Sequence, residues 1–251
     1  MKILAIIPAR GGSKGIPGKN TKLLNGKPLM SYTSEIALQS HYLTEVIVST
    51  EDKQIVEVAE RLGLKVPFVR PMALAEDHTP TLHVIIHALQ WFEKQTIFFD
   101  AVCLLQVTSP FRTVDFLDKA IVKFIESGCD SLVSVQKVPH EYNPHWTFEV
   151  NAEGNLKIAT GEAEIISRRQ ELPPAYHRDG SIYIKGGVGR GGRRAYYNPS
   201  SRRGFVQVCA LALRRPVARL LAGRLRGALA AGHCCTRQIA PARHGPEACV
   251  L

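Results

Sequence analysis

The chain has 251 residues, of which 45% are hydrophobic, and its formal net charge is +10 at pH 7. This length suits one α/β domain with a small appendage, and it is sufficient to bury a sizeable core. No apolar run approaches the roughly 18 residues that span a bilayer, and the apolar start is too short for a signal peptide. We therefore expect a cytoplasmic protein that is neither transmembrane nor secreted.

Short apolar runs alternate with helical patterns along residues 1–185. Strands are predicted where Val, Ile or Leu cluster, at residues 3–8, 45–49, 65–69, 101–105 and 131–135. Helices are predicted between them, from Pro28 to Ser40, Thr50 to Gly63, Pro80 to Phe92 and Thr113 to Gly128. This alternation predicts an α/β fold with a doubly wound, mostly parallel, Rossmann-like sheet. Such sheets bind ligands where their strands end, so the loops after the strands are the places to search.

The loop after the first strand, residues 8–20, holds four Gly and three cations, Arg10, Lys14 and Lys19. Backbone N–H groups of Gly-rich turns can surround an anion, and the cations can neutralise phosphate charge. The loop matches neither the Walker A pattern nor G-x-G-x-x-G. Because it directly follows an apolar first strand, we interpret it as a phosphate-binding loop rather than an ordinary surface loop.

Five segments, in order, resemble the acylneuraminate cytidylyltransferases, the family that makes CMP-sialic acid and related CMP-nonulosonates. They are residues 8–20, residues 70–77 (Arg70-Pro71, Leu74-Ala75 and Asp77), and residues 105–110, 168–173 and 179–184. The third segment has Val107 where the family has Pro. The resemblance covers residues 1–185 and implies a fold like that of the nucleotide-diphospho-sugar transferases.

The resemblance implies a reaction in which the anomeric hydroxyl of a nonulosonic acid attacks the α-phosphate of CTP and releases pyrophosphate. Arg10 and Lys19 would be catalytic, because the leaving pyrophosphate needs charge neutralisation. The expected nucleotide-binding residues are Arg10, Gly11, Gly12, Ser13, Lys19, Asn20, Arg70 and Thr81. The expected sugar-binding residues are Gln106, Arg168, Arg169, Gln170 and Tyr176.

Several of these residues have a structural alternative. Arg70 also fits a surface charge, Gln106 a strand-end residue bonded to backbone, and Tyr176 a packing residue. Either Arg168 or Arg169 suits the sugar carboxylate, and both also fit a solvated face. His83 and His87 lie one helical turn apart, but no acidic or Cys partner of suitable spacing accompanies them, so no metal residue is assigned.

The basic charge is confined to residues 186–251. Residues 1–185 hold 13 Lys and 7 Arg against 21 acidic residues, a net charge of −1. Residues 186–251 hold 12 Arg, one Glu (Glu247) and no Lys or Asp, a net charge of +11. We therefore predict a cytidylyltransferase domain at residues 1–185, lacking the family's usual C-terminal end. Residues 186–251 would be an Arg/Gly/Ala-rich tail that is out of frame or disordered.

The resemblance implies Mg²⁺ as a cofactor, held by Asp residues of an acidic motif that follows the strand ending at Ile184. Those ligands are absent here, because residues 186–251 contain no Asp. CTP and a nonulosonic acid are the implied substrates, and a homodimer whose partner completes the sugar site is the implied assembly. Two other functions remain open: a cytidylyltransferase for another sugar such as an octulosonate, and a non-enzymatic nucleotide-binding body whose basic tail binds nucleic acid. Nucleic acid is not the expected partner, because the charge lies where the chain departs from the family.

Overall fold

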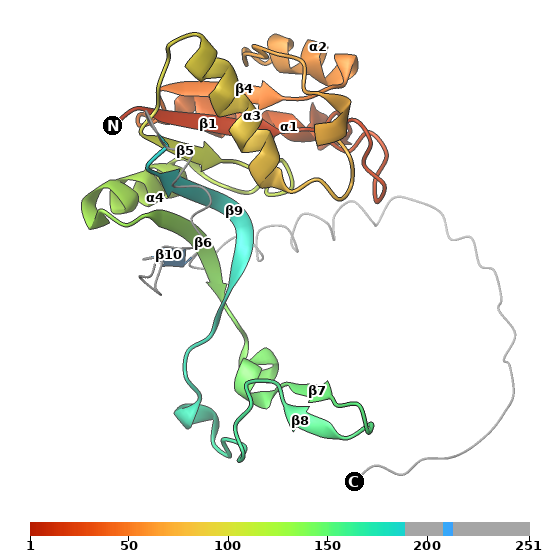
Figure 1. The fold of residues 1–251 in the computed structure, drawn as a ribbon, viewed down its shortest axis with the longest axis vertical. Helices are drawn as coiled ribbons and strands as arrows, with labels where there is room; N and C mark the ends of the chain where they lie inside the picture. Colours follow the sequence, from red (N-terminus) through yellow and green to blue (C-terminus); the bar gives the residue numbers. More distant parts are fainter. Residues whose placement is uncertain (189–207, 213–251) are drawn as a thin grey trace, which may run out of the picture. The chain divides into compact units, whose positions relative to one another are not determined.

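A six-stranded sheet forms the centre of the computed structural model, which describes residues 1–188 and 208–212 (Figure 1). The strand order is β10-β6-β9-β5-β1-β4. The strands are β1 (Ile3–Pro8), β4 (Glu45–Ser49), β5 (Ala101–Leu104), β6 (Ser131–Lys137), β9 (Tyr176–Gly186) and β10 (Val208–Ala212). The pairs β1–β4, β1–β5 and β6–β10 are parallel, and β9 runs antiparallel between β5 and β6. The predicted α/β fold with a mostly parallel sheet is confirmed.

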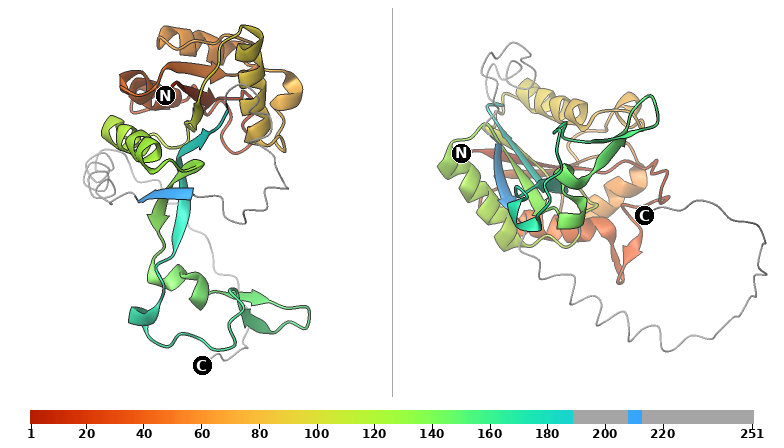
Figure 2. Two further views of the ribbon diagram at one scale, coloured as in Figure 1. Left: turned by 60° about the vertical axis from the view of Figure 1, so that its left-hand side comes forward. Right: turned by 90° about the horizontal axis from the view of Figure 1, so that it is seen from below.

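Helices cover both faces of this sheet (Figure 2). They are α1 (Leu29–Gln39), α2 (Lys53–Arg61), α3 (Thr81–Lys94) and α4 (Val114–Ser127). Successive side chains of a strand point to opposite faces, and every apolar residue of β1 from Ile3 to Ile7 is fully buried. Ile3, Ala5 and Ile7 share a core with α1, α2 and α4, whereas Leu4 and Ile6 share a core with Ala88 and Phe92 of α3. The sheet is therefore doubly wound, as predicted.

Side chains cap the starts of α2 and α4, and one of the two caps differs from the prediction. Thr113 caps α4 as predicted, since its hydroxyl accepts from the Phe116 N–H at 3.2 Å. The prediction that Thr50 caps α2 is wrong. Asp52 caps it instead, because its carboxylate accepts from the N–H groups of Gln54 and Ile55 at 2.8 and 3.2 Å.

The predicted strand at residues 65–69 is also wrong. Only two isolated bridges join this segment to the neighbourhood of β4, Ile47 to Lys65 and Thr50 to Val69. Pro67 lies between the two bridges and has no N–H to donate to a ladder, so a continuous strand does not form. The segment still runs beside β4, and the Arg70 N–H donates to the Thr50 carbonyl at 2.8 Å.

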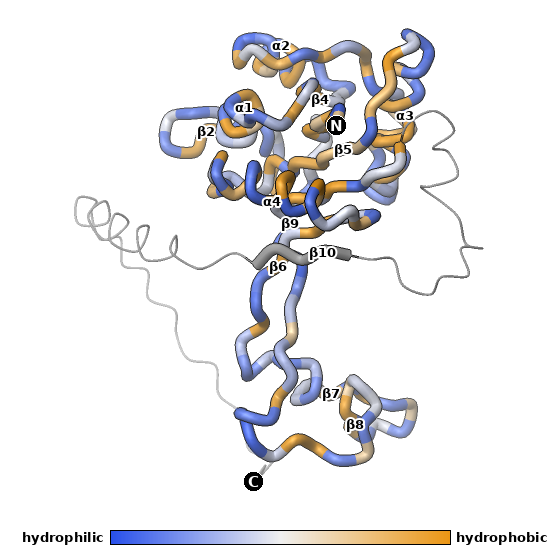
Figure 3. Tube along the Cα trace, turned by 90° about the vertical axis from the view of Figure 1, so that its left-hand side faces the viewer, coloured by the Kyte–Doolittle hydropathy of each residue, from blue (hydrophilic) through white to orange (hydrophobic). Residues whose placement is uncertain are grey.

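Two small hairpins lie outside the sheet. β2 (Leu23–Leu24) and β3 (Lys27–Pro28) are joined by Asn25 and Gly26, whose φ angles of 50° and 79° suit a tight hairpin turn. β7 (Phe148–Val150) pairs with β8 (Leu156–Ile158) in the segment between β6 and β9, where hydrophobic residues alternate with hydrophilic ones (Figure 3). Short 3₁₀ helices complete the described elements: η1 (Met72–Leu74), η2 (His140–Tyr142), η3 (Pro144–Trp146) and η4 (Arg169–Glu171).

The predicted boundary near Lys185 falls at the end of β9. From the segment predicted as a tail, Val208–Ala212 forms β10 and pairs in parallel with residues 131–135 of β6. The remainder of that segment, residues 189–207 and 213–251, lies outside the described residues. Among the residues that are described, no helix has the length and apolarity needed to cross a membrane.

Candidate active site

The carboxyl ends of three neighbouring strands meet at one edge of the sheet. β1 lies between β4, which follows it in the chain, and β5, which is reached only after α2 and α3. The loops that follow β1 and β5 both start at this edge, and in α/β sheets ligands bind outside the carboxyl ends of the strands. A cavity of about 340 Å³ occupies this position, and it is lined from Pro8 and Arg10 after β1 and from Gln106 and Thr108 after β5.

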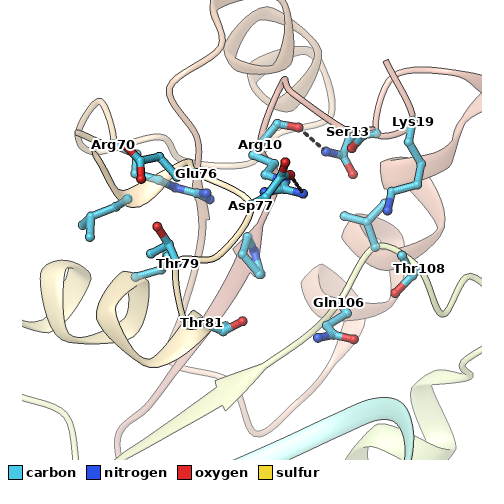
Figure 4. Close-up of a pocket in the computed structure, with 15 residues that line it drawn as sticks. Arg10, Ser13, Lys19, Arg70, Glu76, Asp77, Thr79, Thr81, Gln106 and Thr108 are labelled. Carbon is cyan, nitrogen blue, oxygen red and sulfur yellow. Dashed lines mark hydrogen bonds and ion pairs between the residues drawn. The ribbon is translucent and has the colours of Figure 1, made fainter. Parts of the chain in front are cut away.

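The cavity brings together seven of the predicted site residues: Arg10, Ser13, Lys19, Asn20, Arg70, Thr81 and Gln106. Figure 4 shows Arg70 and Lys19 on opposite sides of the cavity, with Arg10 and Asp77 between them. Its volume lies within the range of small-ligand pockets, which is about 300–1,000 Å³. Arg10, Lys19 and Arg70 bring three cations to this lining, the kind of group that binds phosphates, and Glu76 and Asp77 bring two carboxylates.

Asp77 holds two cations of the phosphate-binding loop. Its Oδ1 lies 2.6 Å from Nη2 of Arg10, and its Oδ2 forms an ion pair with Nζ of Lys14. The hydrogen bond from Lys14, together with the charges of Lys14 and Arg10, lowers the pKa of the Asp77 carboxyl below its ordinary value. Asp77 therefore neutralises part of the positive charge of this loop.

Side-chain and backbone contacts fix the shape of the loop. The side chain of buried Asn20 donates from Nδ2 to the backbone carbonyl of Arg10 at 2.8 Å. The backbone carbonyl of Asn20 accepts from the Met30 N–H at 3.0 Å. The Gly11 N–H donates to Oε1 of Glu51 at 2.7 Å rather than pointing at the cavity. Neither Gly11 nor Gly12 lines the cavity, so in this state the structure does not place these two predicted nucleotide-binding residues at its surface.

Arg70 is buried, with a side chain that is 3% exposed, so the alternative of a surface charge is wrong. Its Nε donates to Oγ of Ser49 at 3.1 Å and its Nη2 donates to the Ser49 carbonyl, both at the end of β4. Burial lowers the pKa of Arg70, and the Glu51 carboxylate opposes that shift. The guanidinium is thus held in place while it still lines the cavity.

Gln106 follows the end of β5 and lies beside Gly180 of β9. Its carbonyl accepts from Nη2 of buried Arg112 at 3.0 Å, so its backbone is anchored while its side chain lines the cavity. Burial lowers the pKa of Arg112 to about 10. A Cβ added at Gly180 would lie 3.2 Å from Oε1 of Gln106, so Gly180 leaves room for this side chain.

The predicted sugar-binding residues beyond Gln106 do not line this cavity. Arg168 is largely exposed, and its Nε lies 3.8 Å from the Glu171 carboxylate. Arg169 and Gln170 belong to η4 and are also exposed, as is Tyr176 at the start of β9. Within one chain, the structure therefore separates these four residues from Gln106.

Some lining residues were not predicted as site residues. They are Pro8, Leu74, Glu76, Asp77, Thr79, Val84, Val107 and Thr108. Thr108 and Val107 follow Gln106 directly, so their position after a strand was a usable signal. Glu76 and Thr79 come from the connection between η1 and α3, whose path over the cavity no local pattern indicates.

The described residues do not fit a magnesium site. Among them, no three His, Cys, Asp or Glu side chains come close enough to hold a metal ion together. The two carboxylates of the cavity are engaged elsewhere, Asp77 with Arg10 and Lys14, and Glu76 with His78 at 3.0 Å. A hard divalent cation needs several oxygen ligands, and the described carboxylates do not supply such a set. No reaction step that uses a metal ion is therefore derived from them. The expectation of Mg²⁺ stays a prediction.

The fold and the cavity define an α/β protein that presents a cationic pocket where its parallel strands end. Comparison with protein families gives a match over residues 4–205 to a model described as cytidylyltransferase. The chain belongs to this cytidylyltransferase family, and the predicted membership is confirmed. The match ends beyond the predicted boundary at residue 185.

Relatives within this family include CMP-nonulosonate synthetases. The chain is 43% identical to a CMP-N,N'-diacetyllegionaminic acid synthase of Legionella pneumophila, and the match covers 73% of this chain and 78% of the relative. It is 40% identical to a pseudaminic acid cytidylyltransferase of Campylobacter jejuni, over the same shares of each chain. Among solved structures, a CMP:2-keto-3-deoxy-manno-octonic acid synthetase complexed with CTP has the same fold. Its TM-score is 0.60 at 18% identity, and the match covers 92% of this chain and 99% of that one.

Proposed function

We propose that the protein couples CTP to a nonulosonic acid of the sialic acid type, giving the CMP-sugar and pyrophosphate. The observation that carries the proposal is the cationic cavity at the ends of β1 and β5, lined by Arg10, Lys19 and Arg70. The relatives named for legionaminic and pseudaminic acid support the substrate class, since both are similar to this chain over most of their length. Both names denote nonulosonic acids, and neither sugar is favoured over the other.

The chemistry follows from charge. The anomeric oxygen of the sugar forms a bond to the α-phosphorus of CTP, the bond from that phosphorus to the bridging oxygen breaks, and the hydroxyl proton leaves to solvent or a base. Negative charge builds on the departing pyrophosphate, and Arg10 and Lys19 would stabilise it by charge-assisted hydrogen bonds. Asn20 keeps Arg10 in place by donating a hydrogen bond to the backbone carbonyl of Arg10. Gln106, anchored by Arg112, would orient the sugar.

We propose that the active form is a homodimer in which the β7–β8 segment of one chain reaches the sugar site of the other. Large apolar side chains are exposed in this segment: Tyr142, Phe148, Val150, Leu156, Ile165 and Tyr176. Exposed apolar clusters of this kind favour association. Arg168 or Arg169 would then bind the sugar carboxylate across the interface. Sedimentation of the wild type and of a V150D/L156D variant tests this, since Val150 and Leu156 face each other in the hairpin.

A substrate panel tests the reaction. Pyrophosphate release would be measured with CTP and legionaminic, pseudaminic or N-acetylneuraminic acid, with an octulosonic acid as the competing sugar, with and without a chelator. The proposal expects release with at least one nonulosonic acid, and the chelator shows whether that release needs a divalent cation. Release with the octulosonic acid alone would favour the other sugar class. Salt-sensitive RNA binding without any release would favour the non-enzymatic alternative.

We further propose that the change in composition after residue 185 limits this activity. The Arg-rich stretch lacks the Asp residues that the family uses after this point. Translation of the gene in its other two frames beyond codon 185 tests the idea, as does a chain that carries the alternative C-terminus. Equal activity of the two chains contradicts it. A cytoplasmic location belongs to the same proposal, supported by the free, buried thiols of Cys103 and Cys129.

A further inference from the structure

Glu51 lies two residues beyond the end of β4, and its side chain is 8% exposed. It does not line the cavity. Its two carboxylate oxygens have different partners. Oε1 accepts the Gly11 N–H at 2.7 Å, and Oε2 lies 3.9 Å from Nη1 of Arg70. One carboxylate therefore accepts a hydrogen bond from the phosphate-binding loop and lies within ion-pair distance of the buried guanidinium.

The charges around Arg70 require such a partner. Arg70 is buried, and its remaining contacts are neutral ones to the hydroxyl and the carbonyl of Ser49. The charge of Arg10 also acts on it unfavourably. Glu51 is the acidic group that compensates, and Oε2 has no hydrogen-bond partner within the described residues. An unpaired guanidinium at this depth would either leave its position or draw water into the site.

Helix formation gives Glu51 no role. The next residue, Asp52, caps α2 by accepting from Gln54 and Ile55. Glu51 is not a member of either apolar core, and both of its polar contacts go to groups of the site. Gly11 also packs closely against Asp52, the residue after Glu51, because a Cβ added at Gly11 would lie 2.2 Å from Oδ2 of Asp52. The loop is thus pressed against the start of α2 where Glu51 receives its N–H.

We propose that Glu51 is a positioning residue of the nucleotide site, which sets the separation between the phosphate-binding loop and Arg70 through a single carboxylate. The inference rests on the proposed function, because Arg70 and the loop are taken as the groups that contact CTP. Glu51 itself touches no substrate. Its loss should weaken the binding of CTP while the sugar side of the cavity, built on Gln106 and Arg112, is unchanged.

Kinetic constants of Glu51→Gln and Glu51→Ala test this role. The amide of E51Q can still accept the Gly11 N–H but carries no charge for Arg70, whereas E51A loses both contacts. We expect E51Q to raise the KM for CTP about tenfold and E51A by more, the scale seen when a supporting contact of a binding group is lost. The KM for the sugar should stay within about twofold. Glu57→Gln on the exposed side of α2 is the matched control and should leave all constants unchanged.

A purely structural role gives a different result. It would lower the melting temperature and kcat together, with both KM values unchanged, and that pattern overturns the inference. Unchanged CTP kinetics in E51Q and E51A overturn it as well. A variant that fails to fold is replaced by Glu51→Asp, which keeps the charge but shortens its reach, and which should raise the KM for CTP without loss of the melting transition.

A spectroscopic readout separates this inference from the proposed function. Calorimetric titration of the wild type with CTP tests the function, and absence of binding removes it. The amide proton resonance of Gly11 tests Glu51 independently, because a hydrogen bond to a carboxylate shifts it downfield. It should move upfield in E51Q and further in E51A, and not in E57Q. A Gly11 resonance that is the same in all three variants overturns the inference whatever CTP does.

Discussion

Arg10 and Asp77, 67 positions apart in the sequence, form an ion pair of 2.6 Å across the cavity, and Asp77 also pairs with Lys14. Two of the cations predicted to meet the triphosphate are therefore already neutralised by the protein. On the proposed function, CTP displaces this carboxylate, and the displacement lowers the apparent affinity for the nucleotide.

Asp77→Asn should consequently tighten CTP binding. An exposed ion pair contributes up to about 1 kcal/mol, so we expect a gain of about two- to fivefold. Arg10 and Lys14 lower the pKa of Asp77, so the carboxylate is charged throughout about pH 6–9 and the gain should be constant there. Calorimetric titration with CTP measures it. Glu76→Gln is the control, since Glu76 pairs with His78 instead. Weaker binding in D77N would mean that Asp77 organises the cations rather than competing for them.

Lys19→Ala should reduce kcat for pyrophosphate release. Removal of one group that stabilises developing charge typically costs about 10²–10³-fold. Lys22→Ala provides the comparison, because Lys22 lies two residues beyond the loop, is exposed and does not line the cavity. Initial rates at saturating CTP and sugar measure both variants. Equal losses in the two variants would contradict a specific role for Lys19.

Gly11→Ala and Gly12→Ala form a matched pair within the loop. A Cβ at Gly11 would meet Oδ2 of Asp52 at 2.2 Å, whereas a Cβ at Gly12 meets nothing within 4 Å. We expect G11A to displace the loop or the cap of α2, with a stability loss of about 1–3 kcal/mol as in overpacked sites. G12A should be close to neutral. Urea unfolding measures the difference, and two equally stable variants would show that the loop has more room than the structure gives it.

Gly180→Ala should disturb the side chain of Gln106, which lies next to Gly180. Gly180 has φ of +77°, and its Cβ would lie 3.2 Å from Oε1 of Gln106. Gly154→Ala is the control, because Gly154 has φ of +82° with nothing within 4 Å. Both variants carry the left-handed backbone strain of about 1–2 kcal/mol. Only G180A should also raise the KM for the sugar, and an unchanged KM would place Gln106 outside the sugar site.

Cys103 should resist alkylation in the folded protein. It is fully buried in β5, and burial raises the pKa of its thiol to about 12, although the charge of Arg112 opposes the shift. A raised pKa leaves the thiol protonated at pH 8, and the thiolate is the reactive form. Iodoacetamide treatment followed by peptide mass spectrometry should find Cys103 unmodified without urea and modified in urea. Modification of the native protein at the rate of a free thiol would contradict the burial.

Much of the architecture could be predicted because its signals are local. β1 and β4 have the bounds that their apolar runs predict, and Thr113 caps α4 as its hydroxyl and position indicate. The strand predicted at residues 65–69 failed because one Pro cancels an otherwise suitable run. Direction and neighbours in the sheet are non-local, so nothing in residues 176–186 indicated that β9 lies between β5 and β6.

The site divides in the same way. Arg10, Lys19, Arg70 and Gln106 were predicted from local motifs that resemble the family, and Gln106 also from its place after a predicted strand; all four line the cavity. The capture of Arg10 by Asp77 and of the Gly11 N–H by Glu51 depends on how separate segments fold over one another. Such contacts are a property of the assembled structure, and no spacing in the sequence encodes them.

The central place of β9 has a consequence for synthesis of the chain. β6 and β10 are joined to the rest of the sheet only through β9, among the strands described. Until the ribosome has released residue 186, β5 and β6 each present an unpaired edge, and the side chains that later become buried include all four of β5 and Leu132 and Val135 of β6. The nascent chain therefore passes through an interval in which β1, β4 and β5 are available but the sheet is incomplete. Chaperone demand and aggregation should concentrate in that interval.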